Sequence, residues 1–529
     1  MLVPQRDEAR FMDLRRLIAE LPGKTGTVHT FERGKASHHS HASLHGEVMR
    51  VRQALLDWGV RPGMRVGIYA PNSLAWMIHD LALIDICAIS VPFTDDFAGQ
   101  VHNELLARYD VALLLTSKSN AKLFAQKPAH VAFIDAENGD VRALDRMPKP
   151  EADSGDQHSL VFSSGSAGGL KGLVISRKGI EDTLPPIYGA LGLQPGERLQ
   201  LFLPLSNLQQ RNMCYAALWY DFDLIVTDYS QLFAAMKALK PTLLLAPPVM
   251  YQMIHGEFER LPDKEKHRRM MLARAISLVP VASWRMALAR QFFKDFHDQF
   301  GGKMRMLVTG MAPIRREMGE FFARMQLPLC ETYGLVEVGA ITWRPAGSRE
   351  YGSVGKVLPG ICLTFEDDGE IVVHRDHHPA LRYFQAADGE NERTFIGPGS
   401  VATGDIGNMD GDGNVYLQGR KREQITTPGG YKVHPEVIEN ELNHSPDVAQ
   451  SVVFLKPGAS QLTCVVALQQ PEADGARARV KKYAAGLTSI KKIAQFIDVI
   501  YADEIFTREN RMLRPNMKLD RKAIAAKYG

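Results

Sequence analysis

Apolar residues along the first part of the chain alternate between helical and extended spacing. They recur at helical spacing from Leu44 to Trp58, and a short apolar run, Val66 to Tyr69, follows the turn Arg61-Pro62-Gly63. Strands that alternate with helices predict α/β layers built on mainly parallel sheets. The same pattern predicts a helix over Ala75–Leu83 and strands over Val111–Leu115, Val131–Ile134, Leu160–Phe162, Leu243–Ala246, Met306–Thr309 and Ile371–His374.

The pattern changes near Gly419-Arg420. A turn-rich stretch precedes this point, and about a hundred residues with strand and helix signals of their own follow it. These signals cover Glu436–Leu442, Val452–Leu455 and Cys464–Leu468. We therefore expect a large N-terminal domain over residues 1–419 and a small α+β domain over residues 420–529.

Composition narrows the classes of function. The 529 residues include 63 Lys and Arg against 60 Asp and Glu, a net charge of +3, which argues against nucleic acid as the main partner. No apolar run approaches the ~20 residues that span a bilayer, and residues 1–16 lack the apolar core of a signal peptide. The five cysteines lie far apart without a CxxC pair, which excludes a disulfide framework and a Cys-based zinc site. These observations fit a cytoplasmic globular enzyme.

The strand that ends at Phe162 runs into a loop rich in Gly and Ser, Ser163-Ser-Gly-Ser-Ala-Gly-Gly-Leu-Lys-Gly172. Its glycines let the backbone approach phosphate oxygens, its hydroxyls add donors, and Lys171 supplies a positive charge. Lys171 precedes Gly172 rather than Ser or Thr, so this is not a Walker loop. By itself the loop favours phosphate binding only slightly over an ordinary surface turn.

Four further motifs follow the loop. They are Glu331-Thr-Tyr-Gly-Leu-Val-Glu337, Thr403-Gly-Asp405, Gly419-Arg420 with Ile425, Gly429-Gly430 and Pro435 to Glu439, and Lys518 within Arg514 to Arg521. Together and in this order, the five motifs resemble the adenylate-forming superfamily of acyl-CoA synthetases, luciferases and peptide-synthetase adenylation domains. Leu203-Pro-Leu-Ser-Asn-Leu-Gln-Gln-Arg211 and Leu307-Val-Thr-Gly-Met-Ala-Pro313 look most like the long-chain fatty acid–CoA ligases.

The resemblance implies a reaction in two steps. A carboxylate is a poor acyl donor, so ATP first converts it to an acyl-AMP with release of pyrophosphate, and a thiol then takes the acyl group. Bringing two anions together requires cations and dipoles that are fixed before the reaction. The resemblance assigns Mg²⁺ to Glu337 and the β- and γ-phosphates to Lys171 and the loop residues Ser163, Ser164, Gly165, Ser166 and Gly168.

The later motifs supply the other contacts that the resemblance implies. Tyr333 would lie against the adenine ring, and Asp405 would accept hydrogen bonds from the ribose hydroxyls with support from Arg420. Lys518 would bridge the substrate carboxylate and the α-phosphate. Gly310, Met311 and Gly334 are assigned to the same nucleotide site.

The first candidate for the thiol acceptor is CoA. The resemblance implies that the small domain is mobile and rotates about Arg422, so that Lys518 leaves and Gly429-Gly430 line a tunnel for pantetheine. The phosphopantetheine arm of an acyl carrier protein presents the same thiol, so both acceptors stay open. A non-catalytic relative that keeps only the nucleotide pocket is the alternative of another class.

Several positions depart from the family pattern and motivate that alternative. Among them are Ala167, Leu170, Val336, Met311 and Asn207. Lost hydroxyls weaken phosphate binding by about 1 kcal/mol each, which slows catalysis without abolishing it. Because the charged groups persist, we expect a working enzyme. Met311 and Asn207 are expected near the adenylate and the acyl pocket, and they predict an acyl group or acceptor unlike that of a housekeeping fatty acid enzyme.

Two clusters of charged or titratable residues fall outside these motifs. The first, His38, His39, His41 and His45, lacks ordered ligand spacing and predicts a solvated segment rather than a metal site. The second is the basic run Arg268, Arg269, Arg274, Arg285 and Arg290. It predicts a solvated helix face, with peripheral contact to anionic lipid or to CoA phosphates as the alternatives.

Overall fold

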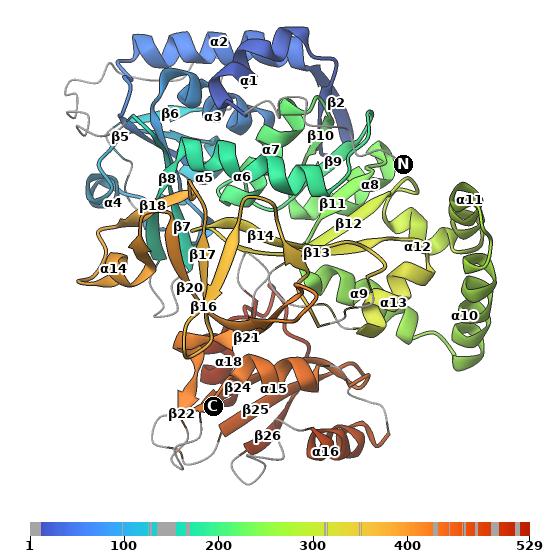
Figure 1. Cartoon of the computed structure of the whole chain (residues 1–529). Coiled ribbons are helices and arrows are strands. Elements are labelled where there is room, and N and C mark those ends of the chain that lie inside the picture. Colours follow the sequence, from blue (N-terminus) through green and yellow to red (C-terminus); the bar gives the residue numbers. More distant parts are fainter. Residues whose placement is uncertain are drawn as a thin grey trace.

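Figure 1 shows the computed structural model of the chain, a large N-terminal part with a smaller C-terminal part, orange to red, beneath it. The structure describes residues 12–529 except for 98, 125, 127, 129, 135–154, 165–169, 311–313, 315, 349, 351, 427–431, 444, 457–458, 460–461, 471–473, 488–496 and 514–518.

The first large sheet has the strand order β15-β14-β13-β12-β11-β9-β10-β1-β2. The strands from β13 to β1 in this order are parallel, whereas β14, β15 and β2 pair antiparallel at its edges. In chain order the strands are β1 (Thr27–Glu32), β2 (Lys35–Ser40), β9 (Arg198–Leu201), β10 (Asp223–Val226), β11 (Leu243–Leu245), β12 (Met306–Gly310), β13 (Leu329–Leu335), β14 (Gly339–Arg344) and β15 (Lys356–Val357).

The second large sheet has the order β18-β8-β7-β4-β3-β5-β6. From β7 to β6 its strands are parallel, and β8 pairs antiparallel with both β7 and β18. Its strands are β3 (Arg65–Tyr69), β4 (Ile89–Pro92), β5 (Val111–Thr116), β6 (Val131–Phe133), β7 (Gln157–Ser164), β8 (Leu170–Ser176) and β18 (Ala380–Phe384). The predicted α/β layers with mainly parallel sheets are therefore confirmed.

A continuous apolar core joins the two sheets through helices. α2 (His41–Asp57) shows why these segments fold as helices: Leu44, Val48 and Leu55 fall on one face and are fully buried, and the Ser40 hydroxyl caps the first turn. The same core includes α1 (Leu14–Glu20), α3 (Leu74–Ile86), α6 (Arg177–Ala190) and α7 (Leu208–Trp219).

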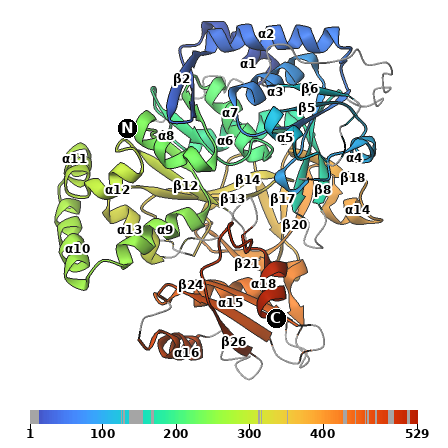
Figure 2. The same ribbon diagram turned by 180° about the vertical axis from the view of Figure 1, so that it is seen from behind.

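The remaining helices of the N-terminal part lie mostly around the first sheet (Figures 1 and 2). They are α4 (Asn103–Arg108), α5 (Lys118–Ala121), α8 (Leu232–Leu239), α9 (Pro248–Glu259), α10 (Asp263–Ser277), α11 (Ala282–Phe292), α12 (Lys294–Gln299), α13 (Arg316–Arg324) and α14 (Glu390–Thr394). In the described part of the chain, no helix has the length and apolar character that crossing a membrane requires.

A third sheet is antiparallel and leads to the C-terminal part. Its strands are β16 (Cys362–Phe365), β17 (Glu370–His374), β19 (Phe395–Gly397), β20 (Ser400–Met409) and β21 (Val415–Arg420). The 3₁₀ turn η4 (Lys421–Glu423) follows β21 directly. The boundary at residues 419 and 420 stays a prediction, and it falls at the end of β21.

The C-terminal part has sheets and apolar cores of its own. Its elements are β22 (Ile425–Thr426), β23 (Lys432–Val433), α15 (Pro435–Leu442), β24 (Val448–Leu455), β25 (Leu462–Leu468), α16 (Ala476–Gly486), β26 (Ile497–Ala502) and α18 (Arg521–Tyr528). It also contacts the large part, because the Arg508 guanidinium lies 6.0 Å from the ring centroid of Tyr229. An α+β C-terminal unit is thus confirmed.

The histidine cluster differs from its interpretation as a solvated segment. His38 and His39 lie in β2, whereas His41 begins α2 and is fully buried, with its Nδ1 3.2 Å from Asp221 Oδ1. The solvated interpretation is wrong for His41, because its ring packs directly over Gly26. Among the described residues, no group of three or more His, Cys, Asp or Glu side chains could hold a metal ion.

A buried ion pair crosses the helical layer between the sheets. Arg211 of α7, 0% exposed, places Nη2 2.5 Å from Asp80 Oδ1 of α3, which is 2% exposed. Arg211 Nη2 also donates to Ser90 Oγ at 2.7 Å, and the Tyr215 hydroxyl donates to Asp80. The motif arginine of the Leu203–Arg211 element therefore serves the core.

We expect Asp80→Ala to lower the free energy of unfolding by about 3–5 kcal/mol, because it leaves the Arg211 charge buried without its anion. Denaturant titration followed by circular dichroism measures the change. Arg50→Ala, which removes an exposed pair with Glu47, is the matched control and should leave stability unchanged. Equal effects of the two substitutions would contradict this account of the core.

Candidate active site

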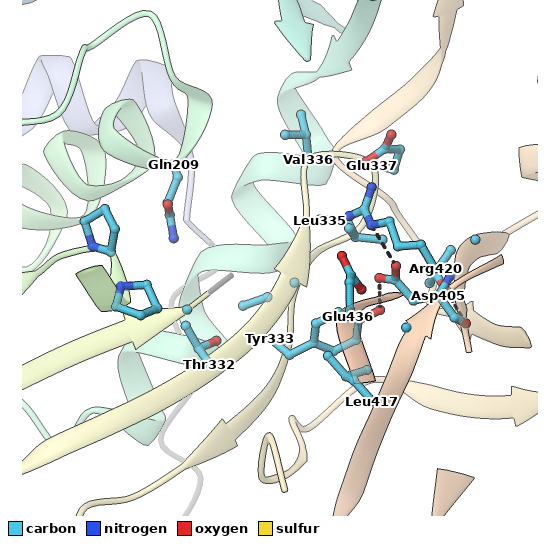
Figure 3. A pocket seen from close by; sticks show the side chains of 18 of the residues that line it. Gln209, Thr332, Tyr333, Leu335, Val336, Glu337, Asp405, Leu417, Arg420 and Glu436 are labelled. Carbon is cyan, nitrogen blue, oxygen red and sulfur yellow. Dashed lines mark hydrogen bonds and ion pairs between the residues drawn. The ribbon is translucent and has the colours of Figure 1, made fainter. Parts of the chain in front are cut away.

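A continuous cavity of about 1140 Å³ lies where the first and third sheets meet the C-terminal part. Its walls come from the carboxyl ends of β12 and β13, from α6, α7 and α9, and from β20, β21 and α15. Ligands of open α/β sheets bind at the carboxyl ends of parallel strands, so this is the expected place for a site. Figure 3 shows that Tyr333, Asp405, Arg420 and Glu436 gather on one side of it and Gln209 on the other.

The polar end of the cavity is organised by Asp405. Asp405 lies directly opposite Arg420 in the β20–β21 pair, and Arg420 Nε is 3.1 Å from Asp405 Oδ1. The Tyr333 hydroxyl, which arrives from β13, donates to Asp405 Oδ2 at 2.7 Å. One carboxylate therefore joins the first sheet to the third at the cavity wall.

Burial controls the charges around Asp405. Burial, and then the neighbouring Asp405 carboxylate, raise the pKa of Tyr333 well above its usual range, so the phenol stays neutral and donates. Burial alone would lower the pKa of Arg420, but Asp405 and Glu436 offset it and raise that pKa. The site thus holds a cation and an anion in contact before any ligand arrives.

A second polar group lies around Lys171, which the β7–β8 hairpin places opposite Ser163. Lys171 Nζ forms an ion pair with Glu390 of α14 and lies 5.1 Å from the ring centroid of Tyr383. Burial by itself would raise the pKa of Glu390, but the hydrogen bond and charge of Lys171, with smaller contributions from the Ala387 backbone and Arg422, together lower it. Lys171 is therefore a partly shielded cation at the rim of the cavity.

Glu337 belongs to the same group. Its Oε1 accepts a hydrogen bond of 2.8 Å from the Tyr383 hydroxyl, and its side chain lines the cavity (Figure 3). A carboxylate oxygen suits Mg²⁺, and a lone protein carboxylate matches the usual mode of Mg²⁺ binding through one or two carboxylates plus substrate phosphates. The residues present thus fit a magnesium ion that is held jointly with a nucleotide.

The opposite end of the cavity is mainly apolar. Its described lining comes from α6 (Leu184, Ile187, Tyr188, Leu191), α7 (Leu208, Gln209, Asn212, Met213), β11 (Leu243, Leu245) and the start of α9 (Pro248, Val249, Gln252). Asn207, expected near the acyl pocket, begins α7 and is not one of these described lining residues. The apolar end can accept a hydrocarbon chain.

The C-terminal part closes the third side. Glu436 of α15 and Arg521 of α18 line the cavity, together with Leu513 and Leu519, which pair across an isolated β-bridge. Arg521 forms an ion pair with Glu439, and its Nη2 lies 2.8 Å from Glu439 Oε2. This contact anchors the chain immediately after Leu519.

The described glycines of the predicted site are required by packing. A Cβ on Gly310 would lie 2.9 Å from the Thr332 carbonyl oxygen, and a Cβ on Gly334 would lie 2.3 Å from the Gly339 carbonyl oxygen. Gly419 has φ +140°, and a Cβ there would meet the His434 side chain. Several predicted site residues lie outside the described part: Gly165, Ser166, Gly168, Met311, Gly429, Gly430 and Lys518, and for Ser163 and Ser164 only the backbone is described.

Sequence reasoning missed several residues of the site. Tyr383 and Glu390, which hold Glu337 and Lys171, come from β18 and α14 and carry no motif. Arg422, predicted as a hinge, has Nη1 3.8 Å from Glu390 Oε1. Glu436 and Arg521 also line the cavity, and they lie inside motifs recognised in the sequence, Pro435 to Glu439 and Arg514 to Arg521.

Comparisons with known proteins give the family. Residues 14–378 match the family described as AMP-binding enzyme. The chain belongs to this family. This match confirms the predicted resemblance to adenylate-forming enzymes. The relatives include fatty-acid–CoA ligases, which supports the prediction that the protein is an AMP-forming acid–thiol ligase.

Alignments with individual relatives cover nearly the whole chain. The long-chain-fatty-acid–CoA ligase FadD15 of Mycobacterium bovis is 27% identical over 556 aligned positions, with 92% of this chain and 90% of the relative covered. ATP-bound MatB from Rhodopseudomonas palustris has a TM-score of 0.73 at 20% identity, covering 97% of this chain and 98% of that one. The O-succinylbenzoate coenzyme A synthetase MenE of Bacillus subtilis, in complex with AMP, has a TM-score of 0.71 at 18% identity, covering 96% and 97%. The two structures show the same fold.

We expect Glu439→Gln to destabilise the C-terminal part by about 1–3 kcal/mol, because Gln keeps the size but removes the charge that faces Arg521. Thermal unfolding and protease cleavage near residue 520 measure the loss. Glu504→Gln removes an exposed carboxylate that pairs with Lys527 and should change neither readout. Unaltered cleavage in Glu439→Gln would show that this ion pair does not anchor the segment.

Proposed function

We propose that this chain activates a carboxylic acid, with fatty acids as the first substrate class, by forming an acyl-AMP from MgATP. It then transfers the acyl group to the thiol of CoA. The observation that carries the proposal is the continuity of the cavity: the polar end at Asp405 and the apolar end at Leu184 open into each other. A nucleotide and an acyl chain can therefore meet inside it.

Asp405 is the proposed ribose acceptor. Each of its oxygens already faces a donor, Tyr333 on one side and Arg420 on the other, which fixes the carboxylate plane before substrate arrives. A pre-oriented carboxylate accepts from both hydroxyls of a ribose at little reorganisation cost. In this arrangement Tyr333 positions Asp405 through its hydroxyl, and its ring lines the nucleotide space.

Lys171 is the proposed phosphate ligand. In the described structure it pairs with Glu390, and we infer that the β- and γ-phosphates replace or share this partner when ATP binds. Glu337 would hold Mg²⁺ beside them. The ion, when bound, neutralises charge on the phosphate oxygens.

Lys518 is the proposed bridge between the two reacting anions. Its neighbour in sequence, Leu519, lines the cavity, and the Arg521–Glu439 ion pair fixes the chain two residues after Leu519. We propose that Lys518 reaches the cavity and lowers the charge cost of carboxylate attack on the α-phosphate.

The apolar end and the names of the relatives support the substrates. Fatty-acid–CoA ligases among the relatives favour a fatty acid and CoA over a carrier protein. We further propose that the C-terminal part rotates about Arg422 between the two steps, which would break the 3.8 Å contact of Arg422 with Glu390 and bring Gly429-Gly430 to the thiol. We place the activity in the cytoplasm, consistent with the free cysteines of the described chain.

ATP–pyrophosphate exchange across short, long and aromatic acids tests the proposal. We expect acid-dependent exchange, strongest with long-chain acids, because the acyl end is apolar. Asp405→Asn should reduce kcat/KM for ATP at least ~100-fold, as the loss of a charged hydrogen-bonding partner implies. Asp410→Asn, at a half-buried aspartate of the turn before β21, is the matched control. Absence of exchange with every acid would leave only a nucleotide-binding relative.

The two half-reactions should separate at Lys518. Lys518→Ala should abolish acyl-AMP formation yet spare transfer from supplied acyl-AMP to CoA, because the lysine acts only where two anions meet. Lys527→Ala, at an exposed lysine on α18, should leave both steps intact. Equal loss of both steps in Lys518→Ala contradicts its role, and faster transfer to a carrier protein than to CoA corrects the acceptor.

A further inference from the structure

The helical hairpin α10–α11 projects from one edge of the molecule (Figures 1 and 2), and α14 lies on the opposite side. Its inner face is anchored, because Ala273 and Ile276 of α10 and Ala289 of α11 are buried in a core with Phe293 and Phe296. The other face of the hairpin has no such cover among the described residues. The hairpin is thus a fixed projection with a free outer surface.

Large apolar side chains cover the free surface and the tip. Leu278, next to the turn, is 79% exposed, Trp284 is 66% exposed and Met271 is 59% exposed. Val281 and Phe292 add to the same set. Met271 lies on α10 seven residues before Leu278, the residue that ends the helix in αR conformation, so these two side chains fall on one face. Val281 precedes α11 and Trp284 lies in its first turn. Such a concentration marks an interaction surface rather than scattered exposure.

Beyond the first turn of α10, the charged side chains of the hairpin are all basic. From Lys266 to Lys294 the sequence contains seven Lys and Arg and no Asp or Glu, whereas the whole chain has a net charge of +3. Glu265 pairs with Arg268 and Arg269 near the start of α10. Within the described residues, no acidic side chain pairs with Arg274 or Arg285, which flank the apolar tip.

The tip itself has a defined shape. Arg285 Nη1 donates to the carbonyl oxygens of Val279 at 2.9 Å and Pro280 at 3.2 Å. These bonds tie α11 back onto the turn, so Leu278 and Val281 are presented by an ordered loop. A solvated helix face would not need apolar residues at its most exposed point.

We propose that the α10–α11 tip docks on an anionic lipid surface. Apolar side chains, with Trp among them, enter the interface, while arginines beside them meet the phosphate and carboxylate headgroups. CoA phosphates would explain the arginines but not Trp284 and Leu278. The inference goes beyond the proposed function and holds whichever acid is activated.

The hairpin lies close to the apolar end of the cavity. α9 separates it from the cavity: Val249 and Gln252 line the cavity, while Ile254 and Phe258 pack in the core under the hairpin. When the hairpin is docked on a bilayer, α9 separates the apolar end of the cavity from the lipid, in which apolar acids dissolve.

Vesicle binding tests the proposal on the full chain. We expect co-sedimentation with phosphatidylglycerol-containing vesicles, weak binding to pure phosphatidylcholine, and at least a tenfold loss between ~0.1 M and ~0.5 M salt. Trp284 supplies a direct signal because it is 66% exposed, whereas Trp76, Trp219 and Trp343 are buried and Trp58 is half-buried. Its fluorescence should shift to the blue with anionic vesicles only.

Paired variants locate the surface. Leu278→Ser with Trp284→Ser, and separately Arg268→Glu with Arg274→Glu, should each lower the vesicle partition coefficient at least tenfold. Ile396→Ser, at an apolar residue 46% exposed on β19, and Arg15→Glu on α1 are the matched controls and should bind as the wild type does. Unchanged thermal melting and exchange activity with a short, water-soluble acid show that each variant is folded.

Three results would overturn the proposal. The first is no binding of the wild type to anionic vesicles, and the second is an equal loss of binding in the control variants. The third is a concentration-dependent dimer that dissociates in Leu278→Ser with Trp284→Ser while vesicle binding is absent. That result would assign the face to a second copy of the chain.

Discussion

The site depends on one buried carboxylate with two partners. Asp405 accepts from Tyr333 of the first sheet and faces Arg420 of its own third sheet, so it links the two sheets at the polar end of the cavity. Arg420 is also the last residue before the chain leaves for the C-terminal part. Arg420 therefore links the polar end of the cavity to the segment that leads into the C-terminal part.

Other cations of the cavity are also paired with carboxylates. Lys171 with Glu390, and Arg420 with Asp405 and Glu436, are cations held against carboxylates before any substrate arrives. Fixed charges of this kind stabilise developing anions without solvent reorganisation. The described lining of the apolar end contains no such ion pairs. The cavity is therefore polar at one end and apolar at the other.

Not every motif residue serves chemistry. Arg211, in the element that most resembles fatty acid ligases, is buried against Asp80. Gly310 and Gly334 are held by close backbone contacts. Part of the family pattern thus records how the layers fit together.

Local pattern determined the elements of this protein. The spacing of Leu44, Val48 and Leu55 specified α2, and the alternation of strands and helices specified parallel layers, because side-chain periodicity is a property of neighbours along the chain. Ordered motifs also specified the family and named Asp405, Lys171 and Glu337. The tertiary structure alone decided that Tyr383 and Glu390 hold Glu337 and Lys171, that His41 is buried, and that Leu278 and Trp284 are exposed. Each of these depends on segments distant in sequence, and no local pattern specifies which distant segment will cover a side chain.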